Sequence, residues 1–126
     1  MVGLISKDYL IRSYVVLCND KLETYALKML DSPEQLADSY GIWETSSNPD
    51  DRIVEFLTGG FGLAPSSTYK GFYYSEDDHH KPFSAAYKDK ISMAIDEDHA
   101  TWTDGTDNHG TSVRIIEKWF WFEASF

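Results

Sequence analysis

This 126-residue sequence has one cysteine and about half as many basic as acidic side chains. The single cysteine, Cys18, cannot form an intramolecular disulfide, so the fold must be stabilised by its apolar core. Apolar residues make up 42% of the chain and aromatic residues 15%, a composition far from that of disordered segments. A chain of this length matches one ordinary domain, so we expect residues 1–126 to form a single domain.

The sequence also lacks a long hydrophobic run. Its first apolar stretch, from Val2 to Cys18, is interrupted by Lys7, Asp8 and Arg12. It therefore has no continuous apolar segment typical of a signal peptide, and it is too polar to span a bilayer. We expect a cytoplasmic protein in which Cys18 is a buried core thiol without chemical function.

Negative charge is the strongest feature of the composition. The chain has 21 acidic and 11 basic residues and a formal net charge of −10, and the segment from Glu76 to Asp107 alone contains nine acidic and three basic residues. Such a field repels nucleic acid and anionic membranes and favours encounters with basic proteins or cations. Solubility is the alternative explanation for this charge.

The first half of the chain predicts one strand and three helices. Residues 13–18 are rich in β-branched and aromatic side chains, which favours a buried strand. Residues 20–30 carry apolar side chains at helical spacing after a capping-box start. Helix-start signals with proline at the first helical position predict further helices over 32–41 and 48–57.

The second half predicts strands. We expect them over 71–75, 82–87, 91–96 and 113–122, with a turn over 103–110 forming a hairpin, although the apolar spacing of 113–122 also fits a helix. The expected fold is α+β, an antiparallel sheet of about four or five strands with the helices of the N-terminal half packed on one face.

Three histidines lie beside carboxylates, namely His80, His99 and His109, but none has a diagnostic metal-binding spacing. The chain also has no nucleophile elbow, and Gly59–Gly62 lacks the ending of a phosphate-binding loop. We therefore predict no catalytic residue and no cofactor, and we favour a non-enzymatic protein. A metal-dependent hydrolase or small-ligand binder using these loops is the alternative.

The remaining pattern is a mixture of large aromatic and acidic residues, which resembles the aromatic centre and charged surroundings of protein interfaces. The candidate partner-binding residues are Tyr73, Tyr74, Glu76, Asp77, Asp78, Asp96, Glu97, Asp98, Trp102, Asp104 and Asp107.

In size, acidity and lack of a catalytic motif, the chain is similar in composition to bacterial toxin-immunity proteins and phage-encoded inhibitors of host defence. This similarity assigns no role to any residue. The leading hypothesis is an inhibitor that neutralises a basic protein such as a nuclease or toxin, without binding nucleic acid or membranes itself. A structural subunit that self-associates through an aromatic face is a further alternative.

Overall fold

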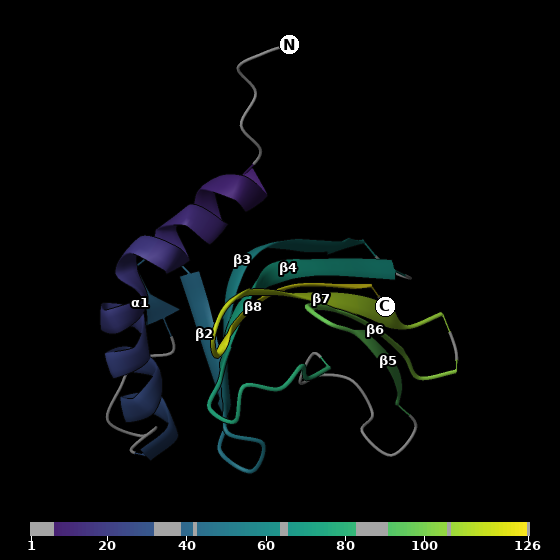
Figure 1. The fold of residues 1–126 in the computed structure, drawn as a ribbon. Coiled ribbons are helices and arrows are strands. Elements are labelled where there is room, and N and C mark those ends of the chain that lie inside the picture. The colour runs from purple at the N-terminus through teal and green to yellow at the C-terminus, as the bar shows by residue number, and fades with distance from the viewer. Residues whose placement is uncertain are drawn as a thin grey trace.

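The protein consists of one helix packed on an open antiparallel sheet of eight strands, as shown by a computed structural model that describes residues 7–31, 39–41, 43–63, 66–82, 91–105 and 107–125. The elements are α1 (Lys7–Asp31), β1 (Ser39–Tyr40), β2 (Trp43–Asn48), β3 (Ile53–Leu63), β4 (Ser66–Ser75), β5 (Ser92–Asp96), β6 (His99–Thr103), β7 (His109–Ile116) and β8 (Trp119–Ser125). The strand order is β1-β2-β3-β4-β8-β7-β6-β5. Figure 1 shows α1 against one face of this strongly curved sheet.

The α+β class is confirmed, but the sheet is larger than the expected four or five strands. Residues 71–75 form the end of β4, the strand expected at 91–96 is β5, and the turn expected at 103–110 joins β6 to β7. The segment 113–122 is not one strand, since Glu117 and Lys118 form a turn between β7 and β8. Of the strand expected at 82–87, only residue 82 is described, and it is not in a strand.

The strand expected at 13–18 is wrong, because these residues belong to α1. The helix is kinked at Cys18, whose φ and ψ are −114° and 15°, and the side-chain amide of Asn19 donates to the Val16 carbonyl at 2.8 Å. The start signal at Asn19 and Asp20 therefore marks a kink inside one long helix. No helix in the described part of the chain is long and apolar enough to cross a membrane.

The helix expected at 48–57 is also wrong, because these residues form the β2–β3 turn and the start of β3. The side chain of Asn48 accepts a hydrogen bond from the Asp51 amide, which makes a turn from the same residues that can start a helix. Of the helix expected at 32–41, residues 32–38 lie outside the described part of the chain, and Ser39 and Tyr40 form β1.

Both faces of the central strands are buried. The helix-facing side contains Val15, Leu22, Ala26, Met29, Leu30, Val54, Phe56, Phe72, Tyr74, Trp119 and Trp121. On the opposite side, Tyr73 stacks on Phe120 at 5.1 Å between ring centroids, and Phe122 packs beside them. The segment that follows β4 contacts this second side through His80, whose ring lies 4.7 Å from that of Phe120.

Candidate functional site

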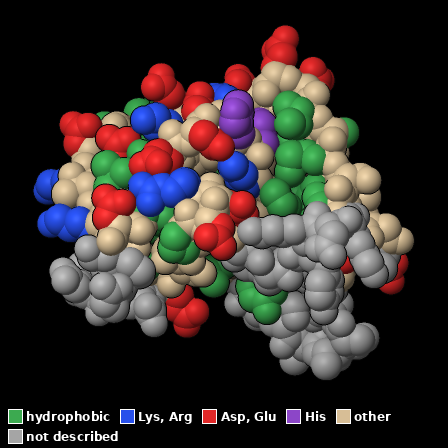
Figure 2. Space-filling model, turned by 90° about the horizontal axis from the view of Figure 1, so that it is seen from below, with side chains coloured by type: hydrophobic (Ala, Val, Ile, Leu, Met, Phe, Trp, Pro, Cys, Tyr) green, Lys and Arg blue, Asp and Glu red, His purple; other side chains and the backbone are tan. Residues whose placement is uncertain are grey.

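Several turns meet at one end of the sheet and gather carboxylates there. Asn48 pairs with Ile53, Ile53 with Ser75, and Tyr74 with Trp119. The β2–β3 turn, the residues that follow β4 and the β7–β8 turn are therefore neighbours. We call this region the acidic end. Its carboxylates are Asp50, Asp51, Glu76, Asp77, Asp78, Asp96, Glu97, Asp98 and Glu117. Figure 2, the view from below, shows acidic side chains there interleaved with lysines, arginines and histidine.

Arg114 connects the two acidic segments that the sequence marked separately. Its Nη1 bonds to the carboxylate of Asp78, and its Nε donates to Asp98 at 3.2 Å. The amide of Lys118 also donates to Asp78, at 2.6 Å. Burial would raise the pKa of Asp78, but the Lys118 amide and the Arg114 guanidinium outweigh it and lower that pKa. Residues 76–78 and 96–98 thus belong to one surface.

Most carboxylates of the first segment are bound within the protein. Arg52 donates to both oxygens of Glu76, at 2.8 and 2.9 Å, and to Asp31 at 3.2 Å. Hydrogen bonding from Arg52 is the main cause of the lowered pKa of Glu76. Lys81 forms an ion pair with Asp77 at 2.9 Å. These carboxylates stabilise the turns, and their charge is largely compensated by their own cations.

The charges of Asp96 and Glu97 remain available to solvent. Both side chains are exposed at the β5–β6 turn, and neither has an ion-pair partner in the described part of the chain. Asp104 and Asp107 lie at the opposite end of β6, about 17 Å away for a five-residue strand. Asp104 is buried and accepts a hydrogen bond from Asn108 at 2.8 Å, whereas Asp107 is exposed. The structure therefore divides the predicted acidic segment.

The three aromatic side chains among the candidate partner-binding residues are buried. Tyr73, Tyr74 and Trp102 are only 2%, 1% and 3% exposed. Tyr74 points into the helix-facing core and donates to Glu23 at 3.0 Å, while Trp102 packs over Gly110. Because both sides of the sheet centre are covered, side chains that alternate along β4 are buried on either side. These aromatics are core residues and offer no surface to a partner.

A buried hydrogen-bond chain holds the segment after β4 against the sheet. The Lys81 amide donates to the Tyr73 hydroxyl at 2.9 Å, this hydroxyl lies 2.6 Å from the Ser112 hydroxyl, and Ser112 lies 2.9 Å from His80 Nδ1. If Tyr73 donates to Ser112 and Ser112 donates to His80 Nδ1, each hydroxyl of the chain has an acceptor. This direction places the imidazole proton on Nε2, a buried atom that makes no hydrogen bond of normal geometry with a described residue, although the Glu97 backbone lies close enough to the ring to affect its pKa.

We expect folding stability to fall between about pH 7 and pH 5 because of His80. Burial lowers the pKa of His80, and Arg114 and His99 add to this effect, although the Glu97 backbone and Asp98 oppose it. The unfolded chain therefore takes up the proton first as the pH falls below about 6.5, whereas stability is fully present above that value. Urea unfolding at a series of pH values measures the slope.

The variant His80→Gln should flatten this pH dependence, because its amide can accept from Ser112 but does not titrate in this range. His109→Gln is the matched variant, since it removes an exposed histidine at the opposite end of the sheet. If the free energy of unfolding fell with decreasing pH as steeply in His80→Gln as in the unsubstituted protein, His80 would not be the cause of the pH dependence.

The three histidines do not form a metal site. His80 is buried and His99 begins β6 near the acidic end, whereas His109 begins β7 at the other end. Within the described ranges, no group of three or more histidine, cysteine or carboxylate side chains could hold a metal ion. The geometry thus gives no support to the metal-dependent alternative.

Strand β5 forms an edge of the sheet. It pairs with β6 from Ser92 to Asp96, and among the described residues no strand pairs with its other side. Its side chains are largely exposed, including Ile95 at 60%. Among the described residues, the β5–β6 hairpin therefore combines an unpaired backbone edge, an exposed apolar side chain and the carboxylates of Asp96 and Glu97 without ion pairs.

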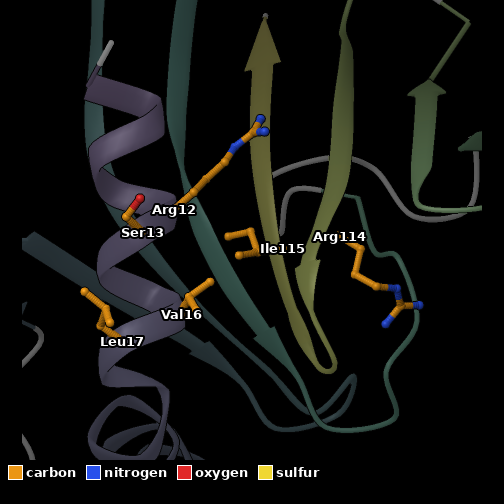
Figure 3. Close-up of a pocket in the computed structure, with 6 residues that line it drawn as sticks. All are labelled: Arg12, Ser13, Val16, Leu17, Arg114 and Ile115. Carbon is orange, nitrogen blue, oxygen red and sulfur yellow. The ribbon is translucent and has the colours of Figure 1, made fainter. Parts of the chain in front are cut away.

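A cavity of about 550 Å³ between α1 and the end of β7 has no counterpart in the sequence predictions. Its lining residues are Arg12, Ser13, Val16, Leu17, Arg114 and Ile115. Figure 3 shows Arg12 extending from the helix toward the strands, whereas the Arg114 guanidinium turns away from the helix. The only sequence signal for this site is Arg12 itself, an arginine within an apolar stretch.

Comparisons with protein-family models, with curated proteins and with solved structures found no match to this chain. Its function must therefore be inferred from the geometry of its own residues.

Proposed function

We propose that this chain is a non-enzymatic binding protein that captures a basic protein through its β5–β6 hairpin. The observation that carries the proposal is the edge of β5, along which no described strand pairs, beside the carboxylates of Asp96 and Glu97, which form no ion pair with a described residue. A nuclease or toxin with a cationic nucleic-acid-binding surface is the class of partner that fits this charge. Binding would cover that surface and inhibit the partner, and the cytoplasm stays our predicted compartment.

The edge of β5 is suited to adding a strand from another protein. Proteins usually protect such edges with lysine, proline or a bulge, and β5 has none of these between Ser92 and Asp96. A partner segment that lies along β5 would gain backbone hydrogen bonds for affinity, and Ile95 would supply an apolar contact. Specificity would come from the side chains that flank this strand.

Charge favours a basic partner over a neutral one. Arg52, Lys81 and Arg114 compensate the carboxylates nearest the sheet centre, whereas Asp96 and Glu97 are two adjacent exposed carboxylates without an ion pair among the described residues. A chain with a net charge of −10 attracts a cationic protein over several ångströms before contact, and salt screens this attraction. Carboxylates at the hairpin can also take the place of nucleic-acid phosphates on the partner.

The test measures association of the purified chain with a panel of purified basic nucleases and toxins by surface plasmon resonance. For a true partner, we expect the association rate constant to fall about tenfold as the salt concentration rises from about 0.05 to about 0.3 M. The double variant Asp96→Asn/Glu97→Gln should slow association about tenfold at low salt with little change in the melting temperature.

The matched control is Glu44→Gln/Asp107→Asn, which changes the net charge by the same amount at exposed sites away from the β5–β6 turn. We expect it to alter the association rate by less than about twofold. Equal slowing in both double variants would mean that only net charge matters, and the proposed binding site would be wrong.

A further inference from the structure

We propose that the cavity between α1 and β7 binds a small amphiphilic anion, with its carboxylate head group on Arg12 and its apolar tail against Val16 and Leu17. This site is separate from the β5–β6 hairpin and does not depend on the proposed function. Its volume of about 550 Å³ lies within the usual range for small-molecule pockets, roughly 300–1,000 Å³.

Arg12 is the cation that would hold the head group. Its guanidinium lies 5.8 Å from the ring centroid of Trp121, which is 4% exposed, so the side chain extends over the sheet instead of into open solvent. Its Nε is buried and has no hydrogen-bond acceptor, and no described carboxylate forms an ion pair with it. In a chain of net charge −10, an arginine without an ion pair among the described side chains is an exception.

Arg114 does not compete for the anion. Its guanidinium is bound by Asp78 and Asp98 and lies 4.9 Å from the Phe120 ring, on the side away from α1. Among the described lining residues, Arg12 alone therefore presents an uncompensated positive charge to the cavity, and a ligand with a single negative charge matches it. The head group would bind the Nη atoms of Arg12, since Nε is buried, and charge-assisted hydrogen bonds to a carboxylate would provide acceptors that the described residues do not offer there.

The apolar part of the cavity explains two unusual surface residues. Leu17 and Val16 are 83% and 46% exposed, which makes them two of the four large hydrophobic side chains that are exposed in the described part of the chain. Ile115 lines the same cavity from the bulge in β7, where the register shifts between Arg114 and Ile116. An alkyl chain lying against these side chains would remove apolar surface from water.

The occupant we favour is therefore a free single-chain alkyl carboxylate. A neutral alcohol would leave Arg12 without its counter-charge, and an alkylammonium would be repelled by it. A second copy of this chain would bury Leu17 but would bring the same net negative charge, which opposes association.

The experiment titrates the purified full chain by calorimetry with decanoate and decyltrimethylammonium below their micelle concentrations and with 1-decanol below its solubility limit. We expect saturable binding of decanoate, at least about tenfold weaker binding of decanol, and no binding of the cation. Arg12→Met, which keeps an apolar side chain of similar length, should weaken decanoate binding at least about tenfold. Leu17→Gln should also weaken it, through the tail.

Lys28→Met is the matched control, because it removes one exposed positive charge from the last turn of the same helix. We expect it to change the decanoate affinity by less than about twofold. Equal affinities for Arg12→Met and the unsubstituted protein would overturn the proposal. The proposal would also be wrong if decanoate bound only in the presence of anionic lipid vesicles. It would be wrong as well if the chain formed a dimer that Leu17→Gln dissociated and that decanoate left intact.

Discussion

Gly71→Ala should reduce the free energy of unfolding by about 3 kcal/mol or more, the largest loss that we expect from a single added methyl group in this protein. A Cβ at this position would lie 2.0 Å from the backbone oxygen of Phe56 and 3.0 Å from the Phe122 ring. The oxygen belongs to the neighbouring strand β3, so the clash can be relieved only by moving the backbone of the sheet centre.

Gly59→Ala is the matched control for this prediction. Gly59 lies in the neighbouring strand, and a Cβ there would meet no atom within 4 Å. Because alanine also restricts the unfolded chain, we expect Gly59→Ala to be neutral or to stabilise by about 0.5 kcal/mol. Urea unfolding compares the two variants. A similar free energy of unfolding for both would show that the Phe56 oxygen does not lie close enough to Gly71 to exclude a methyl group.

Trp102→Ala should cost about 3–5 kcal/mol of folding stability. The indole is 3% exposed, packs with Ala124 and Met93, and covers Gly110 so closely that a Cβ there would lie 2.5 Å from it. Its removal would leave a cavity on the face of the sheet over Gly110, beside Ala124 and Met93. Thermal and urea unfolding measure the loss, and Trp102→Phe should give a smaller one because it keeps part of the ring.

Thr101→Ala is the control for Trp102, since Thr101 is the exposed neighbour on the same strand. It should change the stability by less than about 0.5 kcal/mol. If Trp102→Ala unfolded at the same denaturant concentration as Thr101→Ala, Trp102 would not be a core residue, and it would be available to contact a partner.

The predicted secondary structure is wrong at two segments whose local sequence pattern is compatible with two different structures. Asn48-Pro49-Asp50-Asp51 can begin a helix or make a turn, and both faces of β3 are buried at its start, so its apolar residues have no alternation that would identify a strand. Similarly, the β-branched residues before Cys18 are compatible with a helix once their apolar face packs on the sheet. Tertiary packing decided both segments.

Two hairpin turns were missed because they contain no glycine, although their residues adopt positive φ angles. Glu97 in the β5–β6 turn has a φ of 54°, and Lys118 in the β7–β8 turn has a φ of 71°. Without the usual turn residues, 113–122 was interpreted as one strand. Strand β6 was also missed, although Ala100 and Trp102 alternate with exposed residues and could have indicated it.

The candidate site was predicted only in part. The carboxylates at 76–78 and 96–98 do share one end of the sheet, because Arg114 binds Asp78 and Asp98 together. The aromatic residues expected beside them are buried, and Asp104 and Asp107 lie at the other end of β6. No local sequence pattern predicts the edge position of β5 or the cavity at Arg12, because both depend on which elements are neighbours in the fold.

The sequence by itself determined the acidity of the chain, its α+β class and the helical stripe that follows Asp20, because composition and local periodicity are properties of consecutive residues. Only the tertiary structure decided which charges Arg52, Lys81 and Arg114 compensate and which remain free at Asp96 and Glu97. The physical reason is that ion pairing and burial depend on contacts between residues far apart in the chain, which the pairing of eight strands creates.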